Sequence, residues 1–263
     1  MNIFKRLIAS SFIFAITYFA YAATPISVCT DTNFWYPFTF VKENKEAGGL
    51  HIDIIRKALT NLGYEPSFKP LPWQQCLSEA KAGHFDAVAT VSYKEDRTPF
   101  LNYPESAEKG GKSPERVTQV EYVVITPSHD AKGKPITYTF NGDLKTIPSP
   151  VRVPKGYSIV ENLEKAGLKV EEGPNSIENF KKLVRQKTGS VIDLEEVAKH
   201  LATQPEFSEK YTVAKEPIFS KSYFLAFTKK DEKIKEAEQQ KIWQEIAKIR
   251  NDEKLMGKFL ERY

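Results

Sequence analysis

Apolar positions after residue 23 follow two alternating spacings. Three short apolar runs are typical of buried strands, at residues 26–29, 66–71 and 85–91. Between these runs, apolar side chains recur every three or four positions, which predicts helices over 50–62 and from Trp73 onward. Gly63 and Gly83 follow the two helical segments, and glycine commonly ends a helix. The order strand, helix, strand, helix, strand predicts a parallel sheet with right-handed crossovers.

A polar segment rich in Gly, Pro and charge interrupts this pattern at 105–116 and predicts a boundary loop. A strand is predicted over 120–126, and a second series of strands and helices runs from about 144 to 213. The apolar run at 223–227 predicts a further strand, after which the chain is helical. Because these last helices have no unit of their own, we expect them to pack on the first unit.

The resulting prediction is an α/β protein of two lobes. Lobe 1 comprises 23–107 plus 222–263, and lobe 2 comprises 118–216. The chain crosses between the lobes near 108–118 and 216–222. Two such crossings form a hinge and leave a cleft between the lobes for a ligand.

Residues 1–22 have the pattern of a secretory signal peptide. Lys5 and Arg6 precede an uncharged apolar run, and Ala20-Tyr21-Ala22 is a small-x-small cleavage pattern. An uncleaved anchor helix is the alternative, but the run is shorter than the roughly 20 residues that a membrane span needs. Removal of 22 of the 263 residues leaves 241 and lowers the net charge from +4 to +2. We therefore expect a periplasmic protein without a stable membrane anchor.

The composition is that of a globular protein, with 41% hydrophobic and 27% charged residues, and excludes collagen-like or disordered chains. Basic and acidic residues are mixed along the chain, so we expect no nucleic-acid partner. The sequence has no serine-hydrolase elbow, P-loop, dinucleotide-binding or zinc-protease motif, and its four histidines are isolated. It therefore predicts no metal, cofactor or catalytic residue. The acidic group Asp193, Glu195 and Glu196 is either a carboxylate site or an ordinary helix start.

Four stretches occur in a recognisable order: 36–40 (YPFTF), 49–54 (GLHIDI), Pro72-Trp73 with 83–88 (GHFDAV), and 95–104 (EDRTPFLNYP). Each is a weak signal alone. Their order and spacing, together with the ending at 246–263, resemble the family 3 solute-binding proteins, the periplasmic receptors of polar amino-acid ABC transporters. The similarity extends over nearly all of the chain after residue 22 and is looser in lobe 2.

The resemblance implies a type II periplasmic-binding-protein fold whose two lobes close on a small polar ligand. Arg97 takes the position of the family's ligand-binding arginine, and a guanidinium can hold a carboxylate with two parallel hydrogen bonds. The alternative is a surface ion pair with a neighbouring acid. Ser92 matches a hydroxyl of the family pattern, but Lys94 replaces a threonine, so the ligand need not be a standard α-amino acid.

Aromatic residues after the first strand often stack on the ligand in this family. Phe34, Trp35 and Tyr36 occupy that region, and a core role is the alternative for each of them. Trp73 lies at a strand–helix junction, where it faces either the cleft or the core.

In lobe 2 the family places the loop before a helix on the ligand, here Tyr157 and Ser158. Ser158 and Glu161 also have the spacing of a capping box, which could be the only role of that serine. Asp193 lies near the family's acid for an α-ammonium group, or instead matches a structural aspartate.

The sequence has two cysteines, Cys29 on the first predicted strand and Cys76 on the helix that crosses over it. The periplasm permits disulfides, so we expect a Cys29–Cys76 bond, with two buried thiols as the alternative.

The leading hypothesis is a monomeric, non-enzymatic receptor that binds a small polar, amino-acid-like or carboxylate ligand and delivers it to an ABC transporter permease. Two alternatives remain open. One is a ligand sensor for a signalling kinase, and the other is an enzyme similar to cyclohexadienyl dehydratases, for which Glu195 or Glu196 would be the catalytic acid.

Overall fold

A computed structural model describes residues 23–230 and 233–263, so the predicted signal peptide lies outside the described residues. The main strands of the first part are β1 (Thr24–Asp31), β4 (Tyr64–Leu71) and β5 (Ala87–Ser92). Its helices are α1 (Leu50–Asn61) and α2 (Trp73–Ala82), with short elements at β2 (Phe40–Val41), β3 (Ala47–Gly48), η1 (Glu95–Arg97), β6 (Leu101–Asn102) and η2 (Glu105–Ala107). Every strand and helix predicted here is confirmed.

The second part begins with β7 (Thr118–Pro127). It continues through η3 (Leu144–Thr146), β8 (Val151–Pro154), α3 (Ser158–Lys165), β9 (Val170–Gly173), α4 (Ser176–Gln186), β10 (Ser190–Leu194), α5 (Glu195–Ala202) and β11 (Tyr211–Val213). The chain then returns through β12 (Phe219–Thr228) and ends in α6 (Glu236–Asn251) and α7 (Glu253–Leu260).

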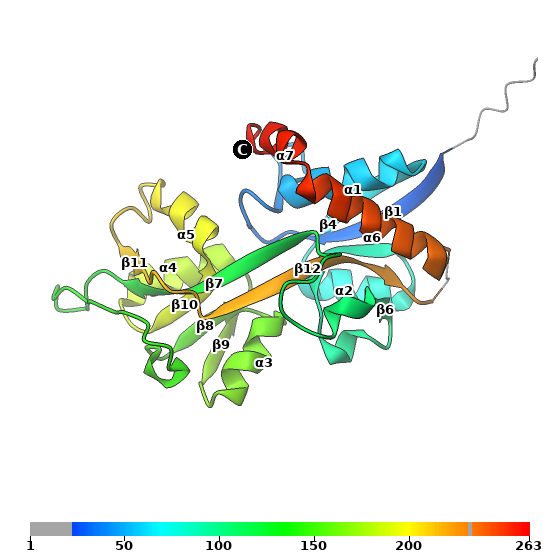
Figure 1. Ribbon diagram of the computed structural model, residues 1–263. Coiled ribbons are helices and arrows are strands. Elements are labelled where there is room, and N and C mark those ends of the chain that lie inside the picture. The colour runs from blue at the N-terminus through cyan, green and yellow to red at the C-terminus, as the bar shows by residue number, and fades with distance from the viewer. Residues whose placement is uncertain (1–22, 231–232) are drawn as a thin grey trace, which may run out of the picture.

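One ten-stranded sheet runs through the molecule in the order β4-β1-β5-β12-β7-β10-β8-β9, with β11 on β7 and β6 on β12. The β4–β1–β5 part is parallel, as predicted from the sequence. β7 and β12 pair with each other at one end only, and beyond that each strand joins a different half of the sheet. These two long strands therefore connect the halves (Figure 1).

Separate hydrophobic cores lie on the two sides of this connection. In lobe 1, α1, α6 and β1 pack around Trp243 and Ile55, and a smaller core beneath α2 contains both cysteines. The core of the second part surrounds Phe180 and Leu194, and it also includes Trp35 from the first part and Tyr223 of β12. The C-terminal helices α6 and α7 contact α1, as expected (Figure 1). The lobe boundaries and the hinge stay predictions.

Local backbone requirements fix the start of α1. Gly49 has a φ of 112°, and a Cβ atom there would lie 2.2 Å from the Phe38 carbonyl oxygen. Only glycine fits this position without moving the loop that leads from β1 toward the cleft.

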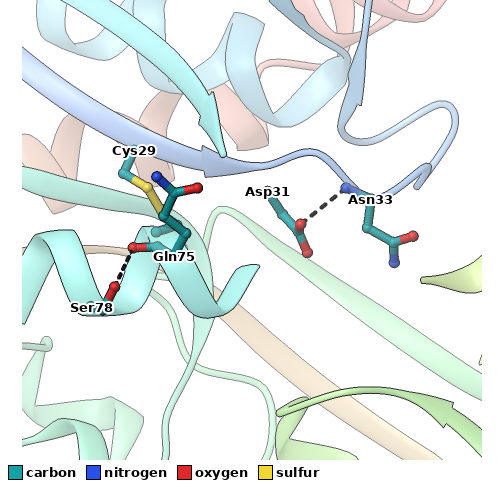
Figure 2. The surroundings of a disulfide bond; sticks show 6 residues. Cys29, Asp31, Asn33, Gln75 and Ser78 are labelled. Atoms are coloured by element: carbon teal, nitrogen blue, oxygen red, sulfur yellow. Dashed lines mark hydrogen bonds between the residues drawn. A yellow bond between two sulfur atoms is a disulfide. The ribbon is translucent and has the colours of Figure 1, made fainter. Parts of the chain in front are cut away.

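Cys29 of β1 and Cys76 of α2 form a disulfide, with their Cα atoms 5.8 Å apart (Figure 2). Both residues are fully buried. Asp31 ends β1 and Asn33 lies two residues later, and both side chains contribute to the site described next (Figure 2).

Candidate functional site

A cavity lies where the carboxyl ends of β1 and β5 meet the loop before α3. This is the edge of a parallel sheet at which α/β proteins bind ligands. The cavity volume is about 20 Å³, room for about one water molecule. Its lining residues are Asp31, Asn33, Trp35, Thr39, Trp73, Thr90, Ser92, Arg97, Tyr157, Ser158 and Tyr223.

Arg97 is the cation of this cavity and is only 3% exposed. Its Nη1 donates to the Ser92 carbonyl oxygen at 2.8 Å and to Ser92 Oγ at 3.3 Å. Its Nη2 donates at 3.1 Å to the Gly156 carbonyl oxygen of lobe 2. The guanidinium also lies 5.3 Å from the centre of the Trp73 ring, a cation–π contact. Arg97 is therefore a buried, oriented donor and not a surface ion pair.

Hydroxyls and backbone carbonyls next to Arg97 also join the two predicted lobes. Ser92 Oγ donates to Ser158 Oγ at 2.7 Å, which joins β5 to the first residue of α3. Trp73 Nε1 donates to the Gly156 carbonyl oxygen at 3.4 Å, and Gln74 Nε2 donates to that of Lys155 at 3.3 Å.

Aromatic rings form the apolar wall of the cavity. Trp35 packs edge-on against Tyr157 and Tyr223, with ring centres 5.4 and 5.2 Å apart. Trp73 lies edge-on to Tyr157 as well, at 6.3 Å. Such rings favour the flat or apolar part of a small ligand.

An acidic group lies in the same cavity. Tyr157 Oη donates to Asp31 Oδ2 at 2.6 Å, and Asn33 Nδ2 donates to Tyr157 Oη at 2.6 Å. Burial raises the pKa of the Asp31 carboxyl to about 6, although hydrogen bonds from Tyr157 and the backbone act in the opposite direction. A cationic ligand group beside Asp31 would remove this penalty.

Six of the predicted site residues come together in the cavity: Trp35, Trp73, Ser92, Arg97, Tyr157 and Ser158. The other two are not among its lining residues. Tyr36 packs on His200, with ring centres 4.1 Å apart. Asp193 is buried behind the site, where its Oδ1 accepts from the Leu194 N–H at 2.8 Å and burial raises its pKa to about 7. The ligand roles of all eight residues stay predictions.

The capping-box prediction for Ser158 and Glu161 is wrong. The N-cap of α3 is Tyr157, without a side-chain cap bond, and Ser158 is the first helical residue. As a result its hydroxyl is turned to Ser92 and the cavity, not to the backbone of the helix.

Sequence reasoning missed five lining residues: Asp31, Asn33, Thr39, Thr90 and Tyr223. For Asp31 a signal existed, because it ends the first strand of a parallel sheet, where ligand-binding side chains gather. Thr90 and Tyr223 lie inside apolar runs and carry no local signal.

Within residues 23–230 and 233–263, no group of three or more His, Cys, Asp or Glu side chains could hold a metal ion. In the same part of the chain, no helix is long and apolar enough to cross a membrane.

Comparisons with known proteins agree with this architecture. The profile of the bacterial extracellular solute-binding proteins, family 3, matches residues 26–261. A search of curated proteins finds no significant match.

Solved structures share the fold at low sequence identity. An ancestral arginine-binding protein bound to arginine is 19% identical with a TM-score of 0.69, over 92% of this chain and 99% of that one. A histidine kinase sensor domain with similarity to periplasmic binding proteins is 15% identical with a TM-score of 0.72, over 92% and 96%. An ancestral amino-acid-binding protein, described as a precursor of cyclohexadienyl dehydratase, is 17% identical with a TM-score of 0.67, over 91% and 95%.

Proposed function

Because the chain belongs to the bacterial extracellular solute-binding proteins of family 3, we propose that it is a periplasmic receptor for a small carboxylate-bearing, amino-acid-like ligand and serves an ABC importer. The observation that carries the proposal is Arg97, a buried guanidinium that lines the cavity between the lobes. A ligand carboxylate would replace the carbonyl oxygens of Ser92 and Gly156 as the acceptor of its hydrogen bonds. Asp31, in the same cavity, would accept a ligand ammonium group.

The proposed mechanism is lobe closure about β7 and β12. Arg97 and Ser92 belong to lobe 1, and Tyr157 and Ser158 belong to lobe 2. In the open form these two pairs of residues are apart. A ligand that contacts both sets binds the closed form more tightly and shifts the population toward it. The permease would then recognise the closed form. Export to the periplasm would use residues 1–22 as the signal peptide.

Isothermal titration against a library of amino acids and organic acids tests the proposal. At least one compound should bind wild-type protein, and Arg97→Ala should abolish its binding, since a buried charge-assisted contact is lost. Arg56→Ala is the matched control, because this exposed guanidinium lies over the Phe68 ring and is not among the cavity-lining residues. Unchanged affinity in Arg97→Ala would remove this residue from the site.

Similarity to a histidine kinase sensor domain favours a second candidate, a soluble sensor for a signalling kinase. Both functions use the same ligand cavity and differ only in the partner of the closed form. Uptake of the radiolabelled compound by cells with and without the gene discriminates between them, because only the transport function requires the protein for uptake.

We propose a non-enzymatic role. Glu195 and Glu196, the acids suggested for a dehydratase, begin α5 and are not among the cavity-lining residues, and Glu195 pairs with Lys199 at 2.8 Å. Turnover of prephenate or arogenate by the pure protein would contradict this proposal.

A further inference from the structure

Lys221 is a second cation close to Arg97, and it lies on the connecting strand β12. Its half-buried side chain extends to the start of α3. There Nζ donates to Asn162 Oδ1 at 2.6 Å, to Ser158 Oγ at 3.2 Å and to the Ser158 carbonyl oxygen at 3.4 Å. Lys221 does not line the cavity itself, but it is one hydroxyl away from it.

The hydroxyl of Ser158 transmits this contact to the cavity. A serine hydroxyl has one proton to donate and two acceptor positions. Ser158 Oγ accepts from both Lys221 and Ser92 Oγ, so both positions are used. The remaining proton makes Ser158 a donor, polarised by the ammonium behind it.

The charges around Lys221 leave an excess of positive charge at this end of the cavity. Arg97 and Lys94 are the cations that act on it, and Glu161 is the acid. Glu161 is already paired with Lys165 at 2.6 Å and lies 3.9 Å from Lys94. An oxyanion placed at Ser92 and Ser158 would be stabilised by both Arg97 and Lys221.

We propose that Lys221 is a positioning residue of an anion seat formed by Arg97, Ser92 and Ser158, and that its charge determines how tightly this seat binds an oxyanion. The inference rests on the proposed function, since it adds a determinant of ligand class to the same site. It restricts the ligand to compounds that present a carboxylate, sulfonate or similar oxyanion at this end of the cavity.

The charge of Lys221 makes the affinity depend on pH. Burial, with a smaller effect of Arg97, lowers the pKa of Lys221 to about 8. Below that pH the ammonium is charged and supports the anion, and above it the support is lost. The affinity for an anion should therefore fall as pH rises through 8. We expect a fall of about tenfold, which corresponds to a change of one unit in the pKa of Lys221 when the anion binds.

Sodium sulfate is the probe, titrated at constant ionic strength against the exported protein at pH 6.5 and 9.5. Tryptophan fluorescence reports binding, because Trp35 and Trp73 line the cavity. We expect sulfate to bind wild-type protein about tenfold more tightly at the lower pH. Lys221→Gln should bind weakly at both values. Lys221→Arg should bind equally at both, because an arginine stays protonated.

Lys229→Gln, at an exposed position just after the same strand, is the control and should retain the wild-type difference between the two pH values. Absence of a sulfate response in wild-type protein, or an identical pH dependence in wild type and Lys221→Arg, would overturn the inference. If Lys221→Gln does not fold, the arginine variant decides alone. A different outcome would contradict the proposed function alone. In that case no organic acid or amino acid binds, although sulfate binding depends on Lys221 as described.

Discussion

At the scale of single residues, Asp31 shows how the site affects stability. Its carboxyl accepts from Tyr157 Oη at 2.6 Å, and burial raises its pKa from 3.8 to about 6. The folded protein therefore holds this proton more tightly than the unfolded chain, so Asp31 destabilises the fold as pH rises from about 4 to 6. Above pH 6 the cost is complete, at most about 3 kcal/mol.

We predict that Asp31→Asn raises the free energy of unfolding at pH 7.5 and has little effect at pH 4, because the amide does not ionise. Urea unfolding at both pH values measures this. Asp143→Asn is the control, since its exposed carboxylate only accepts a backbone N–H from Lys145. An equal gain or loss at both pH values in Asp31→Asn would contradict the prediction.

The sequence predicted which segments lie near the site. It did not predict which side chains of those segments point into the cavity. Arg97 and Ser92 lie within a motif, and their positions in the cavity follow from it. Trp35 and Tyr36 are adjacent in one loop, yet only Trp35 turns into the cavity. Lys221 follows no motif, because its contact with Ser158 depends on how α3 packs beside β12.

At the scale of elements, the disulfide joins β1 to α2. Cys29 lies two residues before Asp31, the last residue of β1. The disulfide closes a separation of 47 residues. Cross-links of this length stabilise by about 4 kcal/mol when the loss of chain entropy in the unfolded state is the main effect.

We therefore predict that the double variant Cys29→Ala, Cys76→Ala loses about 4 kcal/mol of unfolding free energy in urea. Reduction with dithiothreitol should lower the stability of wild-type protein and leave that of the variant unchanged. Thiol titration of the denatured, unreduced protein should give no free thiol. Two free thiols in that titration would contradict the bond.

Elements with a strong apolar period were predictable, and short polar ones were not. The helices α1 and α4 place apolar side chains every three or four residues on a buried face. In contrast, β9 has the sequence VEEG, and only its pairing with β8 makes it a strand. β12 begins inside the predicted second crossing, because 219–223 pair with β7.

At the scale of the whole molecule, one set of contacts between the two predicted lobes lies at Gly156. Its carbonyl oxygen accepts from Arg97 and Trp73, and the neighbouring Lys155 carbonyl accepts from Gln74. Gly156 has a φ of 74°, where a side chain is strained, and an added Cβ would lie 1.6 Å from Gln74 Nε2. A side chain at this position must therefore displace the end of the Gln74 side chain.

We predict that Gly156→Ala shifts the protein toward the open form. The added methyl displaces Gln74 from the Lys155 carbonyl and strains the loop by about 1 kcal/mol. Small-angle X-ray scattering should show a larger radius of gyration than for wild type, while the unfolding free energy falls only by about that strain.

Gln74→Ala is the matched variant: it removes one contact without the clash. The double variant should be more closed than Gly156→Ala alone, because the methyl then has room. A scattering curve of Gly156→Ala that coincides with wild type would show that this contact does not limit closure.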